Sequence, residues 1–185
     1  MVLSKSDDFA IIKSNCLLNL NLFRESYLVS SSVKLSSSGY NIDGLISYII
    51  TLVELGKQSE LYKCSHDLIC TYPDQAISWF SVGCYYYMTR RYEISRRFLH
   101  KCTCLDKYFF AAWIVYGHTF SEQDADDQAM SSYRTVSRYF PNSYQPLLFM
   151  GMGYLNMNNF IYAEKFLKEA YKLFDSDPMI YNELG

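Results

Sequence analysis

The chain has 185 residues, of which 50% are hydrophobic and 17% aromatic, and its formal net charge is -2. The apolar content is sufficient for a hydrophobic core. Surfaces for nucleic acid or anionic membranes need clustered, uncompensated Lys and Arg, which this charge balance argues against. No run approaches the ~18 apolar residues of a membrane span. The N-terminal MVLSKSDDF also lacks the apolar stretch of a signal peptide. We therefore expect an intracellular protein that binds neither nucleic acid nor membranes.

The first predicted elements form a helical hairpin. A helix is expected from Asp7 or Asp8, either of which can cap it, to about Leu20, and its partner covers 23–35. The serine-rich stretch 30–39 indicates a helix end followed by a loop. Because the hairpin lacks the glycine pattern found further along the chain, it is interpreted as a divergent repeat or a cap.

From residue 42 onward the apolar pattern predicts a regular series of short helices. Turn signals separate them at Gly56-Lys57, 89–91, 123–126 and 158–159. The predicted helices cover 42–55, 58–71, 75–88, 92–105, 109–121, 126–138, 143–156 and 159–173. A last helix is expected to start at Pro178, because the missing N–H of proline is tolerated in a first helical turn.

The first helices of successive pairs share a motif that recurs every 34 residues. The motif consists of a glycine and the large residues on either side of it. In register are Trp79, Gly83 and Tyr86, then Trp113, Gly117 and Phe120, then Gly151 and Tyr154, and finally Gly185. Carried backward from Gly83, the interval reaches Ile49, which keeps the apolar character without the glycine. A 34-residue period is the signature of the tetratricopeptide repeat (TPR), a helix-turn-helix unit that stacks on its neighbours.

The second helix of each pair supports the same period. The repeat pattern places small residues at two positions, a large residue between them, and often a proline at the end of the unit. The matching residues are Ala129, Tyr133, Val136 and Pro141 in one unit and Ala163, Leu167 and Ala170 in the next. Small residues let two helices approach closely, and the large ones fill the space between helices.

These patterns predict an all-α fold, a TPR superhelical solenoid of antiparallel helix pairs. A divergent N-terminal hairpin over 1–41 precedes four units, and the start of a further, truncated repeat follows at 178–185. The units are expected at 42–75, 76–109, 110–143 and 144–177. Because the sequence stops in mid-repeat, we expect either a fragment of a longer array or a final helix that another subunit completes.

The first helix of each unit is expected to line a concave groove. Side chains three before, one after and four after the repeat glycine share one helical face. They are Phe80, Cys84 and Tyr87, then Ile114, His118 and Ser121, then Leu148, Met152 and Leu155. This apolar wall suits an extended segment or an amphipathic helix with apolar anchors. The alternative is that these residues pack against one another inside a tight superhelix.

The sequence contains no recognisable catalytic or metal-binding pattern. Nucleophile-elbow, phosphate-loop and zinc-protease motifs are absent. The six cysteines form no C-x-x-C pair and are interpreted as free thiols in a reducing compartment. His118 follows the repeat glycine directly, which favours a structural or ligand-contacting role over a catalytic one. We expect no enzyme activity, cofactor or metal.

One basic run extends from Arg90 to Lys101. Glu93 stands four residues ahead of Arg97, as in a favourable pair on a helix surface. The run is interpreted as a solvated helix face, with a docking patch as the alternative.

Three segments carry a more specific likeness. They are TLVELGKQSELYKCSHDLICTYPDQAISWFSVGCYYYM, AAWIVYGHTFSEQDADDQAMSSY and NNFIYAEKFLKEA. These segments resemble the middle repeats of the cell division cycle protein 16 family, the TPR scaffold subunits of the anaphase-promoting complex (cyclosome). The likeness extends from about Ile42 to Gly185, and its most specific parts are 51–56, 78–86, 112–120 and 127–130.

The resemblance implies a non-catalytic scaffold subunit of a multi-subunit ubiquitin ligase that controls mitotic progression, in the nucleus and cytoplasm. It also implies partners: other subunits of the complex, including TPR subunits, a small helical subunit in the groove, and a second copy through the N-terminal repeats. The groove contacts that it implies are Phe80, Tyr87, His118, Met152 and Leu155.

A TPR peptide-binding adaptor or co-chaperone outside the ligase is the alternative function. TPR modules that clamp a C-terminal carboxylate use Lys, Arg and Asn on the groove face. Those residue types are absent from the predicted wall, so the sequence favours the scaffold.

Overall fold

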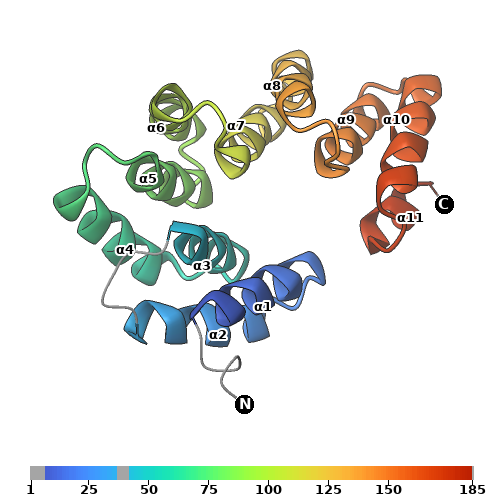
Figure 1. Cartoon of the computed structure of the whole chain (residues 1–185). Coiled ribbons are helices and arrows are strands. Elements are labelled where there is room, and N and C mark those ends of the chain that lie inside the picture. The colour runs from blue at the N-terminus through green and yellow to red at the C-terminus, as the bar shows by residue number, and fades with distance from the viewer. Residues whose placement is uncertain (1–6, 37–41, 185) are drawn as a thin grey trace. The chain divides into compact units, whose positions relative to one another are not determined.

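The structure is a computed structural model that describes residues 7–36 and 42–184 (Figure 1). Every regular element within those ranges is an α-helix. The helices are α1 (Asp7–Asn19), α2 (Phe23–Ser36), α3 (Ile42–Glu54), α4 (Gln58–Thr71), α5 (Ala76–Met88), α6 (Tyr92–Leu105), α7 (Phe110–Ser121), α8 (Asp126–Tyr139), α9 (Gln145–Asn156), α10 (Phe160–Leu173) and α11 (Pro178–Leu184). The predicted all-α class is confirmed.

The helices begin and end close to the predicted positions. The largest difference is at the start of α9, predicted at 143 and observed at Gln145. The division into repeat units remains a prediction, and the signature position Gly185 lies outside the described residues.

The turns within the helix pairs repeat one backbone conformation. Positive φ angles of 66°, 59°, 56° and 57° occur at Gly56, Arg90, Asp124 and Asn158, which are 34 residues apart. In the first of these turns the Lys57 N–H donates to the carbonyl of Leu52 at 2.9 Å, and equivalent bonds close the other three. This is the Schellman arrangement that ends a helix. Asn21, with φ 58°, ends α1 in the same way, so the N-terminal hairpin shares the turn geometry of the later pairs.

The chain divides into two compact units, Met1–Ile94 and Ser95–Gly185, with the boundary inside α6. In the first unit α1 packs against α2 and α3, and α3 packs against α4 and α5. In the second unit α7 packs against α8, α8 and α10 both pack against α9, and α11 packs against α10. No helix in the described part of the chain combines the length and apolar character needed to cross a membrane.

Hydroxyl groups join the three N-terminal helices of the first unit. Ser26 Oγ on α2 lies 3.0 Å from Ser14 Oγ on α1 and 3.2 Å from Thr51 Oγ1 on α3. Thr51 also donates to the carbonyl of Ser47 at 2.6 Å. All four residues are buried. Small hydroxyl side chains let the helices approach closely while each polar group keeps a partner.

We expect Ser26→Ala to lower the free energy of unfolding by about 1–2 kcal/mol, because it leaves two buried hydroxyls short of a partner. Urea denaturation measures the change. Ser32→Ala is the matched control, since it removes an exposed hydroxyl from the same helix. Equal effects of the two substitutions would show that the buried hydroxyl network contributes nothing.

A second polar cluster joins α2 to α4. The Tyr27 hydroxyl donates to Glu60 Oε2 at 2.8 Å, and Lys57 Nζ lies 2.8 Å from Glu60 Oε1. The same Nζ lies 3.6 Å from the centroid of the Tyr27 ring. The hydrogen bond from Lys57 lowers the Glu60 pKa. The N-terminal hairpin is thus attached to the first regular pair by a charged contact as well as by packing.

The repeat-signature residues recur in matching surroundings. The indole N–H of Trp79 donates to the carbonyl of Pro73 at 2.7 Å, and that of Trp113 donates to the carbonyl of Lys107 at 3.0 Å. Both bonds reach back six residues, so the 34-residue period extends to individual hydrogen bonds. Ala129, Ala163 and Ala170 are buried, as is Gly83, whereas Pro141 is exposed and Tyr86, Phe120 and Tyr154 are half-buried.

The two repeat glycines of the second unit, Gly117 and Gly151, lie against large side chains of the following helix. A Cβ at Gly117 would lie 2.3 Å from Cε1 of Tyr133, and one at Gly151 would lie 2.7 Å from the Leu167 side chain. Both neighbours belong to the buried core of the unit. These positions therefore need glycine for close approach between helices and not for backbone freedom.

Candidate partner-binding face

Three of the first helices, α5, α7 and α9, carry no charged side chains, unlike α3, which contains Asp43 and Glu54. No Asp, Glu, Lys or Arg occurs in α5, α7 or α9, whereas α6, α8 and α10 each contain several. A helix that is uncharged all round is covered by its neighbours or faces an apolar partner. These three helices therefore hold the candidate partner-binding residues.

In the first unit the predicted wall is mostly core. Phe80 is 0% exposed and Cys84 is 1% exposed, while Tyr87 is half-buried with its ring centroid 5.8 Å from that of Tyr92. The prediction that Phe80 and Cys84 line an accessible wall is wrong, because their side chains pack within the chain. Tyr87 keeps part of its surface available.

The second unit shows the same separation between core and accessible positions. Ile114 and Leu148, each three residues before a repeat glycine, are buried in its two core clusters. The prediction that Ile114 and Leu148 line an accessible wall is therefore also wrong, because their side chains pack within the chain. Met152 and Leu155 are half-buried against the cluster that contains Leu148, and Ser121 is half-buried at the end of α7. In this unit the residues after the glycine therefore form the accessible part of the face, whereas Cys84, directly after Gly83, is core in the first unit.

His118 connects three helices of this unit. Its Nδ1 lies 2.8 Å from the Tyr133 hydroxyl on α8, and its ring centroid lies 4.5 Å from that of Phe149 on α9 in an edge-to-face contact. Burial lowers the pKa of His118 to about 4. The imidazole is therefore neutral near pH 7, with one donor and one acceptor nitrogen. This arrangement supports the predicted structural or contact role.

Phe149 was missed by the sequence argument. It stands two residues before Gly151, where the preceding unit has Val115, and its ring lies 5.6 Å from that of Tyr133. An aromatic residue beside the repeat glycine was the available signal. The role of Phe149 is its ring contact with His118 in the neighbouring helix pair. A pattern read within a single repeat does not show a contact between repeats.

The face formed by Ser121, His118, Met152 and Leu155, here called the α7/α9 face, has no ionised group at neutral pH. It can bury apolar side chains of a partner. Across the described residues, no group of three or more His, Cys, Asp or Glu is arranged to hold a metal ion.

Helix pairs with a 34-residue period, closed by the same turn each time, define a tetratricopeptide-repeat protein. A TPR protein of Thermus thermophilus has the same fold, with a TM-score of 0.79 and 12% identity over 97% of each chain. At that identity the likeness shows the fold alone.

Closer relatives come from one family. Anaphase-promoting complex subunit 6 of Arabidopsis thaliana is 40% identical over 82% of this chain and 28% of its own length. The human cell division cycle protein 16 homolog is 39% identical over 84% of this chain and 25% of its own length. A crystal structure of the APC/C hetero-tetramer Cut9-Hcn1 matches 98% of this chain and 35% of the matched chain, with a TM-score of 0.92 and 33% identity.

Over most of its length the chain is thus a homologue of the anaphase-promoting complex subunits known as cell division cycle protein 16, subunit 6 and Cut9. This confirms the family resemblance seen in the sequence. The chain spans about a quarter of the length of the curated relatives, 28% and 25% for the two above. A scan against models of known protein families gives no match.

Proposed function

We propose that the chain is a non-catalytic scaffold segment of an anaphase-promoting complex, the ubiquitin ligase of its relatives, and acts in the nucleus and cytoplasm. The observation that carries the proposal is the 40% identity to a subunit of that complex over 82% of the chain. The uncharged α7/α9 face supports it, because the face suits binding and offers no catalytic group. The missing Lys and Arg on α5, α7 and α9 argue against a clamp for a C-terminal carboxylate.

The partners follow from the same relatives. The Cut9-Hcn1 structure shows a homologue bound to another subunit of its complex. We place a corresponding small helical partner on the α7/α9 face, with apolar anchors beside Met152 and Leu155. Other TPR subunits, and a second copy of the protein, are the further partners that the proposal includes.

The direct test is recovery of the complex from cells. The tagged protein, purified gently from dividing cells, should bring down TPR subunits together with a cullin-like and a RING subunit. Recovery of chaperones alone would contradict the proposal and leave only the TPR fold established.

A charge placed on the α7/α9 face should weaken partner binding. We expect Ser121→Lys to reduce recovery of the partner subunits about tenfold, because a charge is costly to desolvate in an apolar interface. Folding should be preserved, since a cation at a helix C-terminus interacts favourably with the helix dipole. Quantitative mass spectrometry of the purified complex measures the recovery.

Ser131→Lys is the matched control, because Ser131 is exposed on α8 and not on this face. It should keep normal recovery, and both variants should keep the melting temperature of the parent protein. Undiminished recovery with Ser121→Lys would place the partner elsewhere.

A further inference from the structure

A second surface of the Ser95–Gly185 unit, on different helices, has the opposite character. Basic side chains stand in register on α8 and α10, where Arg134 and Arg138 are followed 34 residues later by Lys168 and Lys172. Lys165 adds another on α10. All five are exposed. We call this set the α8/α10 basic face.

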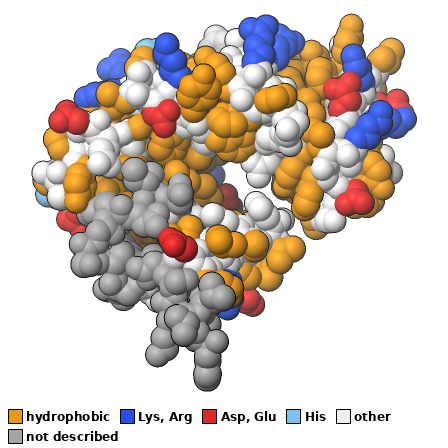
Figure 2. All heavy atoms as spheres, viewed as in Figure 1, with side chains coloured by type: hydrophobic (Ala, Val, Ile, Leu, Met, Phe, Trp, Pro, Cys, Tyr) orange, Lys and Arg blue, Asp and Glu red, His pale blue; other side chains and the backbone are white. Residues whose placement is uncertain are grey.

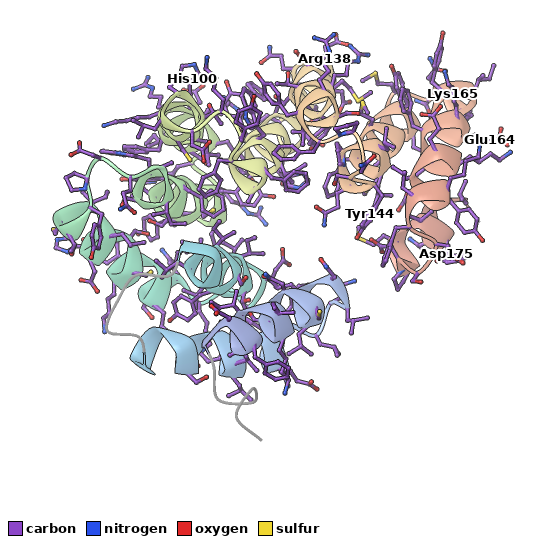
Figure 3. The ribbon with its side chains drawn as sticks, in the orientation of Figure 1. His100, Arg138, Tyr144, Glu164, Lys165 and Asp175 are labelled. Carbon is purple, nitrogen blue, oxygen red and sulfur yellow. The ribbon has the colours of Figure 1, made fainter. Side chains whose placement is uncertain are left out.

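The basic face lies on the outer side of the unit. In Figure 2 blue side chains lie over α8 and α10 along one edge, with red side chains beside them over α10. Figure 3 shows Arg138 and Lys165 pointing outward from that edge, away from α9, with His100 of α6 also directed outward. Arg134 and Arg138, like Lys168 and Lys172, are four residues apart and so share a helical face.

Few of these charges are neutralised within the chain. Lys168 pairs with Glu164, and Arg134 donates to the hydroxyl of Tyr154 at 3.0 Å. Arg138, Lys165 and Lys172 form no ion pair with any residue that the structure describes. Glu164 and Glu169 also stand on α10, among its three lysines. Four further acidic residues of the unit lie at the turn between α7 and α8: Glu122, Asp124, Asp126 and Asp127.

The helix dipole accounts for only part of this pattern. Arg138 and Lys172 stand in the last turns of α8 and α10, where a cation is favourable. Lys165 is the sixth residue of α10 and Arg134 is in the middle of α8, so neither lies in a terminal turn where the dipole acts. The helix dipole therefore leaves these two positions unexplained.

We propose that the α8/α10 basic face binds a carboxylate-rich segment of a partner protein. Complementary charge favours such a segment and speeds its association. The cations are spread along two helices, and most are lysines, which act as compact point charges. That distribution suits several separate Asp or Glu side chains better than one phosphate group, which is held by convergent donors.

The proposal can be tested with a fluorescein-labelled poly-glutamate peptide, whose binding to the purified chain is followed by fluorescence anisotropy. The parent chain should bind it, and the affinity should fall as salt rises from roughly 50 mM to roughly 300 mM, where exposed charges are screened. Arg138→Glu with Lys165→Glu should weaken binding about tenfold, because two attractions become repulsions.

Lys13→Glu with Arg24→Glu is the matched control, because it makes the same change in net charge at exposed positions on α1 and α2. Binding by this control at the parent affinity supports the proposal, provided that circular dichroism shows both variants folded. Equal loss in both double variants would reveal a general charge effect and overturn it. Failure of the parent chain to bind poly-glutamate at low salt, or binding only of a phosphorylated peptide or an RNA, would also overturn it.

The two proposals fail independently. Recovery of the ligase subunits and the effect of Ser121→Lys do not depend on the basic face, and the poly-glutamate measurement does not depend on the α7/α9 face.

Discussion

Gly117→Ala should lower the free energy of unfolding by about 3 kcal/mol, the upper part of the range for overpacking a core. The added Cβ would lie 2.3 Å from Cε1 and 2.8 Å from Cδ1 and Cζ of Tyr133. The ring has little room to move, because Tyr133 is 3% exposed and its hydroxyl lies 2.8 Å from His118 Nδ1. The helices must then separate, or that hydrogen bond must break.

The sign of this effect is informative. In an exposed helix interior, replacing glycine by alanine stabilises by about 1 kcal/mol through helix propensity. A destabilised Gly117→Ala variant would therefore report the contact between α7 and α8 alone. Gly153→Ala is the matched control, because its Cβ would meet only the flexible end of Met130, whose Sδ lies 3.0 Å away. Urea denaturation should show a small change there, and equal changes in the two variants would contradict the packing argument.

Another pair in the chain shows how a larger side chain can be accommodated at the glycine position. Ile49 occupies the repeat-glycine position on α3, and the residue sixteen positions later, equivalent to Tyr133, is the small Ser65. Both are buried. The large side chain has moved from the second helix to the first. Gly117→Ala combined with Tyr133→Ser should therefore cost less than the sum of the two single substitutions, which a double-mutant cycle measures.

The sequence was informative wherever structure depends on the period. Helix order, helix bounds and the close approach at Gly117 all follow from residues that recur 34 positions apart. Repetition supplies several examples of each position, so an irregular member such as Ile49 is still placed correctly. The left-handed turn residues follow the same interval, although Arg90 does not favour that conformation. The position in the turn, and not the residue type, decides the backbone there.

The predicted groove was less reliable, and the reason is geometric. One face of a helix can contain both buried and exposed positions. Here the positions three residues before the repeat glycine face the neighbouring helices. Phe80 and Leu148 are therefore core residues, whereas Met152 and Leu155 keep exposed surface. The hydroxyl network around Ser26 was also outside the reach of periodicity, because its members come from three helices with no shared spacing.

Acid should destabilise the protein through His118. Burial lowers its pKa from 6.5 to about 4. Between these two pH values His118 is therefore protonated in the unfolded chain and neutral in the folded chain. Stability is therefore present in full above the unfolded pKa and is lost as pH falls toward the folded pKa. The loss between about pH 6.5 and about pH 4 should be on the order of 3 kcal/mol, since one pKa unit corresponds to about 1.4 kcal/mol.

His118→Gln isolates this contribution, because glutamine keeps a polar group beside Tyr133 but does not titrate. The variant should be less stable than the parent at neutral pH and lose less stability on acidification, as urea denaturation at a series of pH values would show. His100→Gln, which removes an exposed histidine from α6, should keep the acid loss of the parent chain. If His118→Gln lost as much stability in acid as the parent, His118 would not be the neutral link between α7, α8 and α9. The pKa of His118 would then be near its ordinary value, and the α7/α9 face would gain a charge only as the pH falls below about 6.5.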